Sequence, residues 1–458
     1  MTQAQVQTQM ESLFGIYDAD AFVKELKKTL PQLTDATALA RDAALYLAPR
    51  TVHNDYERFI PYALCGISAA LEASSFAKEE DKVKPVLQQM GLAHIEDRNS
   101  PVDIEAIPAD RAGRINERVE KLSAALRTRD FERSFALLAG LVEDPEDALA
   151  AREATMLAAS RDLLHGGHKL YFLARMWQMA ERMQREKAAV YLYPALHYLL
   201  KAPVDSALAD SVEQLTAGEK SSFPVFNNSK KSLGEAELER LHSSLLFEDR
   251  TTAVGAVIGQ MRDGFSVESV LEGVQLAAAQ ALINAQRGRW LLPVRAFFYT
   301  DCVRTINSFL ASEQRFLLAA LAGAAVNQAS TASREEFGKD AKKNRPWPER
   351  VEKVWPADPF TILRSGQNNS DVGAVISSVL AILEMGEERQ AAFFETLVRL
   401  TAKNDAAVCL GYDIALCGQS IANFQANKGP SRNLHILALA FFIATSEKRF
   451  NFFGGLGF

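Results

Sequence analysis

The sequence predicts an all-α protein, built as a large array of packed amphipathic helices with no significant sheet. Apolar residues recur every three or four positions through nearly all of the 458 residues, which is the period of a helix with one buried face. No segment alternates apolar and polar residues with the period of two that is typical of a strand. Hydrophobic residues make up 48% of the chain, enough for one large core or two of ordinary size.

Individual helices can be located from their apolar stripes and their end signals. The stripes predict helices over residues 20–30 and 111–126, each with one buried face. The segment 144–146, Asp-Pro-Glu, places a proline in the first turn of a further helix. Ser266 opens a long helix, rich in Ala and Leu, that runs up to Ala285.

Three segments are the least regular, because they are rich in Pro, Ser, Asn and charged residues: 101–108, 221–234 and 331–359. The second divides the chain into a predicted N-terminal helical half, 1–220, which holds a histidine hairpin, and a C-terminal helical half, 235–458. A continuous helical array would break in the same places, so a single domain stays open. The third segment contains two tryptophans between prolines, which favours a strap anchored to the helices over a lid.

Charge and hydropathy exclude several classes of partner. Lys and Arg number 51 against 57 Asp and Glu, for a net charge of −6, so we expect neither nucleic acid nor an anionic membrane surface as partner. No apolar run reaches the roughly 20 residues that a membrane span needs. The N-terminus has no basic region followed by an apolar stretch, as a secretory signal has, so we expect a cytoplasmic protein.

The common metal and nucleotide motifs are absent. The four cysteines form no C-x-x-C pair and lie in apolar helical contexts, which predicts buried free thiols. There is no H-E-x-x-H motif, and a single Glu-x-x-His unit stands out, too few ligands for a di-iron bundle, so we expect no metal. No G-x-G-x-x-G or Gly-Lys-Ser/Thr loop occurs, and no cofactor is evident from motifs.

The best local signal for chemistry is a cluster of histidines. His165 and His168 are three residues apart, and on a continuous helix they share a face with Tyr171. The next helix brings Tyr193 and His197. If the two helices pack antiparallel, their imidazoles and phenols would line a common cavity suited to proton transfer with an aromatic or phenolic substrate. The alternative is that these are hydrogen-bonded histidines at helix ends, with no ligand.

Two neighbouring features bear on this site. Gly166 and Gly167 each cost about 1 kcal/mol relative to Ala inside a helix, so we expect a helix start there, or a ligand or neighbouring backbone held close. Arg295 and Tyr299 lie four apart on a strongly apolar helix and would face the same cavity. The alternative for this pair is the wet face of the helix or a structural ion pair.

The order of these segments resembles the questin oxidase-like family, a group of all-helical proteins. The resemblance is carried by a His-Gly helix, an Ala-Leu-aromatic helix after it, and a later helix that leads into an Ala-rich one. The matching segments are FIPYALCGISAALEASS (59–75), LLHGGHKLYFLARMWQMAERM (163–183), YLYPALHYLLKAP (191–203), WLLPVRAFFYTDCVRTINSFL (290–310) and FLLAALAGAAVNQ (316–328). They occur in this order between residues 59 and 328, a span that takes in most of the chain.

The resemblance implies an oxidoreductase, specifically a monooxygenase of secondary metabolism. It would use molecular oxygen for a Baeyer–Villiger insertion into an aromatic, polyketide-type ketone, with NADPH as the reductant reported for fungal members. His165 matches the His-Gly motif. Where the family tends to carry further histidines, this chain has Pro61-Tyr62 and Val294-Arg295, which marks it as a divergent member.

We therefore hypothesise an oxidoreductase that binds a small aromatic or bulky apolar molecule between its helices. The catalytic candidates are His165, His168 and His197. The residues expected to line the substrate pocket are Tyr62, Tyr171, Tyr193, Arg295 and Tyr299. The alternative hypothesis is a non-catalytic helical scaffold that binds a protein or an apolar ligand through a concave surface.

Overall fold

We describe the fold from a computed structural model of the chain. The structure describes residues 10–29, 35–53, 55, 60–96, 100–222, 229–310, 312–333, 358–368 and 371–447. Most of the predicted strap over 331–359 and the middle of the predicted domain boundary, residues 223–228, lie outside the described residues.

Helices follow one another through the first half of the chain. They are α2 (Ala19–Thr29), α3 (Ala36–Leu47), α4 (Ala63–Ser74), α5 (Lys84–Glu96), α6 (Ile115–Thr128), α7 (Phe131–Leu141), α8 (Pro145–Ser160), α9 (His168–Arg182), α10 (Ala188–Lys201) and α11 (Ala207–Thr216). Short 3₁₀ turns join several of them: η2 (Ala48–Arg50), η3 (Glu79–Asp81), η4 (Leu164–Gly166), η5 (Arg185–Lys187) and η6 (Ala217–Ser222).

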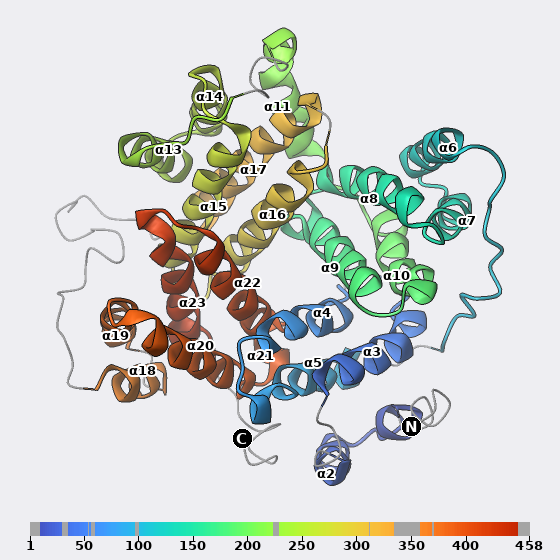
Figure 1. The fold of residues 1–458 in the computed structure, drawn as a ribbon, viewed down its shortest axis with the longest axis horizontal. Helices are drawn as coiled ribbons and strands as arrows, with labels where there is room; N and C mark the ends of the chain where they lie inside the picture. The colour runs from blue at the N-terminus through green and yellow to red at the C-terminus, as the bar shows by residue number, and fades with distance from the viewer. Residues whose placement is uncertain are drawn as a thin grey trace.

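The second half continues in the same way. Its helices are α13 (Glu235–Phe247), α14 (Arg250–Arg262), α15 (Val267–Ile283), α16 (Leu291–Asn307), α17 (Ser312–Ser333), α18 (Pro359–Asn368), α19 (Val372–Leu383), α20 (Gly386–Ala402), α21 (Ala406–Cys409), α22 (Tyr412–Ala426) and α23 (Asn433–Thr445), with the 3₁₀ turn η8 (Pro430–Arg432) before the last. Figure 1 shows the helices of both halves gathered into one broad array.

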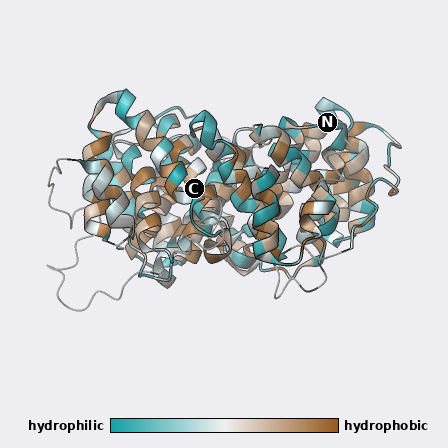
Figure 2. Ribbon diagram, turned by 90° about the horizontal axis from the view of Figure 1, so that it is seen from below, coloured by the Kyte–Doolittle hydropathy of each residue, from teal (hydrophilic) through white to brown (hydrophobic). Residues whose placement is uncertain are grey.

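The all-α class predicted from the sequence is confirmed. Within the described ranges the extended pairing is limited to an isolated bridge between Lys231 and Phe265. Brown and teal residues share the same helices in Figure 2, as amphipathic helices require. None of the helices that the structure describes is long and apolar enough to cross a membrane.

The predicted helix ends hold at most positions. Asp144 and Ser266 cap α8 and α15 by accepting hydrogen bonds from backbone N–H groups of the first turn. The helix predicted from residue 111 begins only at Ile115. The preceding segment is not helical, because Gly113 has a φ of 98° and a right-handed helix cannot contain that conformation. This segment packs on α7, where the N–H of Asp110 donates to the Ala136 carbonyl.

Helices from both predicted halves meet at the middle of the array. There α4 packs against both α9 and α22, and α16 packs against α9 and α22. Figure 1 shows these four helices converging at the centre although they are far apart in the sequence. Whether the two halves form separate domains stays a prediction.

The start of α22 is held by a buried amide. Gln88 on α5 donates through Nε2 to the carbonyls of Thr401 (2.8 Å) and Asn404 (2.7 Å) and to Oδ2 of Asp413 (3.1 Å). Gln88 is fully buried and Asp413 nearly so. Burial raises the pKa of Asp413 to about 7, although hydrogen bonds from Ile414 and Gln88 oppose the shift. This network fixes the position of Tyr412, the first residue of α22.

We predict that Asp413→Asn changes the pH dependence of stability. Between the unfolded pKa of about 4 and the folded pKa of about 7, the folded wild type binds more protons than the unfolded chain, so its stability falls as the pH rises. The variant lacks this group, and its stability relative to wild type should rise across that window by up to about 1.4 kcal/mol per pH unit. Urea unfolding at pH 4.5 to 8 measures this; a difference that stays constant over the range would contradict it.

Candidate functional site

The candidate site begins with the turn that leads into α9. His165 lies in the 3₁₀ turn η4 with a φ of 53°, and Gly166 and Gly167 follow with φ values of 69° and 80°. The helix itself begins at His168, so His165 and His168 do not lie on one continuous helix. Of the explanations predicted for the glycine pair, the structure shows a helix start.

The same glycines also allow a close approach by α16. A Cβ on Gly166 would lie 3.0 Å from Cβ of Arg295, and a Cβ on Gly167 would lie 2.4 Å from Cδ2 of Tyr299. Carbon atoms at that second separation overlap well inside the 3.5–4.0 Å optimum. The neighbour pressed against the pair is therefore formed by side chains of α16, and it brings Arg295 next to the start of α9.

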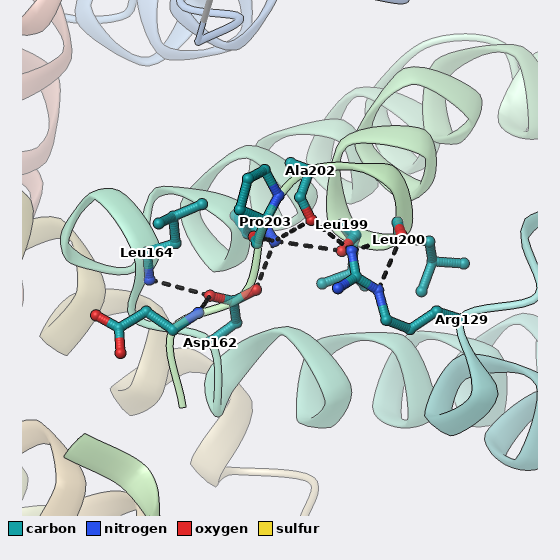
Figure 3. Close-up of polar contacts among 9 residues, drawn as sticks. Arg129, Asp162, Leu164, Leu199, Leu200, Ala202 and Pro203 are labelled. Atoms are coloured by element: carbon teal, nitrogen blue, oxygen red, sulfur yellow. Dashed lines mark hydrogen bonds and ion pairs between the residues drawn. The ribbon is translucent and has the colours of Figure 1, made fainter. Parts of the chain in front are cut away.

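A buried ion pair fixes this turn from the other side. Nζ of Lys169 donates to Oδ2 of Asp162 at 2.5 Å and to the Pro203 carbonyl at 2.5 Å. The other carboxylate oxygen of Asp162 accepts the backbone N–H groups of Leu164 (3.0 Å) and Asp205 (3.1 Å). Figure 3 shows Asp162 between these partners. Burial lowers the pKa of Lys169, and the Asp162 carboxylate opposes the shift.

Two cationic side chains cap the C-terminal end of α10 by contacting its last carbonyls. Arg129, in the left-handed region with a φ of 57°, donates to the carbonyls of Leu200 (2.9 and 2.6 Å) and Ala202. Nζ of Lys169 lies 3.4 Å from the carbonyls of Leu199 and Ala202. Positive charge is favourable at a helix C-terminus, where carbonyls lack helical partners. Hydrogen bonds of Lys169 thus join the turn 162–169 to the end of α10.

Four side chains form the core of the site, which we call the Arg295 cluster: Arg295, Tyr62, Tyr412 and His168. Nη2 of Arg295 donates to the hydroxyl of Tyr62 at 2.6 Å, and Nε donates to the hydroxyl of Tyr412 at 3.2 Å. The Tyr412 hydroxyl also lies 3.2 Å from Nδ1 of His168. The four come from α16, the residue before α4, the start of α22 and the start of α9, and each is buried.

The donors of this cluster limit where its protons lie. The Tyr412 hydroxyl accepts from the Arg295 guanidinium, which has no acceptor atom, so its own proton is available to Nδ1 of His168 or to the Tyr62 hydroxyl. Burial and the charge of Arg295 lower the pKa of His168 well below its usual value, while the Pro61 carbonyl opposes the shift. His168 is therefore a neutral imidazole.

Arg295 makes no ion pair with a carboxylate in the part of the chain that the structure describes. Burial alone would lower its pKa, but Tyr412 and Tyr62 outweigh burial and the pKa is raised. Burial also raises the pKa of both phenols, against the opposing effect of Arg295. The guanidinium is thus charged while its partners are neutral. A buried charge that is only hydrogen-bonded to neutral groups is expensive.

Tyr171 and Tyr299, two predicted pocket residues, lie beside the cluster. The ring of Tyr171 stacks on Phe298 at 4.5 Å and its centroid is 5.9 Å from that of His168. The Tyr299 hydroxyl donates to the Ser160 carbonyl at 2.7 Å. Tyr299 thereby ties α16 to the end of α8, and nothing in its contacts suggests a role in chemistry.

The other two candidates, His197 and Tyr193, face a different part of the molecule. The ring of His197 meets Phe131 of α7 at 4.9 Å, and Tyr193 meets Phe135 at 4.8 Å. Burial lowers the pKa of His197 to about 4. The next residue, Tyr198, is the one that approaches His168, at 6.1 Å. The structure thus does not bring His197 together with His168.

Sequence reasoning missed Tyr412, Lys169 and Asp162. Tyr412 follows Gly411, whose φ of 71° marks a turn immediately before a helix, and the Leu-Gly-Tyr-Asp sequence is the local signal that was available. Lys169 follows His168 directly inside an apolar helix, and a charge there is expensive unless it is paired. Its partner was not apparent because it precedes the helix by several residues.

Comparison of the chain with protein families, curated proteins and solved structures finds no match. Among the described residues, no group of three or more His, Cys, Asp or Glu side chains is placed to hold a metal ion. The four cysteines are buried, and none of them is part of a disulfide.

NADPH, the reductant that the resemblance implies, has no fitting place at the start of α9. A pyrophosphate needs open backbone N–H groups at a glycine turn. The open sides of Gly166 and Gly167 are filled by Arg295 and Tyr299. The glycine pair therefore serves helix packing.

We predict that Lys169→Met strongly destabilises the protein. Removing one partner of a buried pair leaves the other charge uncompensated, at a cost of about 3–5 kcal/mol. The control is Lys201→Met, because Lys201 forms a more exposed pair with Glu132 at 3.6 Å, whose loss should cost less than about 1 kcal/mol. Thermal melting followed by circular dichroism compares them; equal melting temperatures for the two variants would contradict the role given to Lys169.

Proposed function

We propose that the chain is an oxidoreductase of the questin oxidase type that oxidises an aromatic, keto- or hydroxyl-bearing substrate at the Arg295 cluster. The observation that carries the proposal is the buried Arg295 guanidinium, which the described residues leave without a carboxylate. Such a cation is stabilised when an anionic oxygen binds beside it. An enolate or phenolate of the substrate supplies that oxygen.

The Arg295 cluster includes positions to which the resemblance draws attention. Tyr62 and Arg295 stand where the family tends to carry further histidines, and they are hydrogen-bonded to each other at 2.6 Å. His168, three residues after the His-Gly motif, reaches the same cluster through Tyr412. His165 is half-buried at the edge of the turn. This convergence of separate segments supports the proposal.

The groups of the cluster have distinct roles in the proposed reaction. Arg295 and the phenol of Tyr62 donate hydrogen bonds to the developing oxyanion, which is usually the largest contribution of an enzyme site. His168 is neutral because it is buried and because Arg295 lies close, so an anion bound at Arg295 would raise its pKa. The Tyr412 hydroxyl, 3.2 Å from Nδ1 of His168, would then pass its own proton to the imidazole and take up the substrate proton. In the overall reaction one oxygen atom of O₂ enters the substrate and the other leaves as water. The reduced nicotinamide that the resemblance implies would supply the two electrons and one proton as hydride, and solvent would supply the second proton.

A second candidate is a non-catalytic scaffold that binds a protein or an apolar ligand. The burial of the Arg295 cluster favours this scaffold, since Tyr412 and His168 are each 2% exposed. In that case the cluster is a polar anchor between four helices. Substitutions would then reduce stability, and no oxidised product would form.

We expect Arg295→Gln to abolish most of the oxidation. Loss of an oxyanion donor lowers turnover by about 100-fold or more. The measurement is the gain of one oxygen atom in the mass of 1,8-dihydroxyanthraquinone, incubated with protein, O₂ and a nicotinamide reductant. The control is Arg262→Gln, because Arg262 is an exposed residue paired with Glu219 on the surface.

The same probe reports on binding without turnover, because its absorption shifts when a phenol ionises. Wild type should induce the shift and Arg295→Gln should not. If Arg295→Gln oxidises the probe as fast as wild type does, Arg295 is not the donor to the oxyanion. Absence of any product with wild type, together with loss of stability in Arg295→Gln, would favour the scaffold.

A further inference from the structure

A cavity of about 250 Å³ lies between α8, α9 and α16. We call it the Tyr171 cavity; its lining includes Tyr171, Arg175, Trp177, Asp301, Thr305 and Phe309. The volume equals that of about eight water molecules at roughly 30 Å³ each, so it suits a small ring system. Figure 1 shows the three helices side by side next to the centre of the array.

The inner end of the cavity adjoins the Arg295 cluster. The Arg175 guanidinium lies 5.1 Å over the ring of Tyr171, and that ring in turn lies 5.9 Å from His168. Tyr171 therefore forms the wall between the cavity and the cluster. The outer end is formed by exposed residues, among them Arg182 and Thr305.

Most of the charges around the cavity are paired. Arg175 bonds to Glu72 at 2.7 Å, and Arg304 lies 3.5 Å from Asp301. Arg152, whose guanidinium lies 4.4 Å over the ring of Phe309, pairs with Glu181. Arg182 adds one further positive charge at the exposed mouth, and a lining with so small an excess does not select a highly charged ligand. The aromatic walls favour an aromatic one.

The polar groups at the inner end are placed for a ligand oxygen. Arg175 is 2% exposed and donates to Glu72, Gln178 and Gln419. The buried hydroxyl of Tyr171 lies within hydrogen-bonding reach of the Arg175 guanidinium and of the Cys65 thiol. A guanidinium carries five N–H donors, so these three bonds and the contact with Tyr171 leave one donor for a ligand.

We propose that the Tyr171 cavity is the binding site for the aromatic ring of a neutral or singly charged ligand, with a keto or phenolic oxygen held by Arg175. This inference goes beyond the proposed function: the cavity is a site separate from the Arg295 cluster, because the Tyr171 ring stands between the two. Arg175 would be the residue that recognises the ligand oxygen.

The test is equilibrium dialysis of 1,8-dihydroxyanthraquinone with the full chain. Thr305→Phe fills the exposed mouth of the cavity and should weaken binding at least tenfold, and Thr305→Ser should bind as wild type does. The matched control is Ser308→Phe, since Ser308 is an exposed residue at the end of the same helix and is not among the lining residues. It should leave binding unchanged.

The outcomes separate this inference from the proposed function. Equal affinity of Thr305→Phe and wild type, or no saturable binding to wild type, would overturn the cavity assignment. Binding that Thr305→Phe weakens, without any oxidation by wild type, would support the cavity and contradict the proposed function.

Discussion

The arrangement of the site depends on the close contact between α16 and the glycine pair before α9. Gly166 and Gly167 hold positive φ values and leave space that Arg295 and Tyr299 fill. Any larger residue at Gly167 would push the two helices apart. With the helices in contact, the Arg295 guanidinium reaches phenols from two other segments of the chain. The buried pair of Lys169 and Asp162 then keeps the turn in place on its other side.

The helical class followed from the sequence because helix periodicity is a local property. Each apolar stripe and each N-cap depends on residues within a few positions, as at Asp144 and Ser266. The helix predicted from residue 111 starts later, at Ile115, because Gly113 takes a left-handed φ of 98° and the segment before it packs on α7 through Asp110. The apolar stripe does not reveal this long-range contact.

The candidate site was only partly predictable for the same reason. The sequence drew attention to His168, Tyr171 and Arg295, since a histidine beside glycines and an arginine in an apolar helix are unusual. The sequence does not show which face a helix presents to its neighbour. Adjacent residues on a helix point about 100° apart, and the face of α10 next to His168 carries Tyr198, not His197. Tyr412, separated from Arg295 by more than a hundred residues, had no local signal that linked it to the site.

The proposed function requires that the buried charge of Arg295 stabilises a bound ligand and does not stabilise the fold. Arg295→Met keeps most of the apolar stem and removes the charge, and replacing a buried charge by a well-packed apolar side chain is often neutral or stabilising. The account predicts that Arg295→Met melts at the same temperature as wild type or higher, in thermal unfolding followed by circular dichroism. A melting temperature several degrees lower would show that the guanidinium is a structural anchor, and would contradict the account.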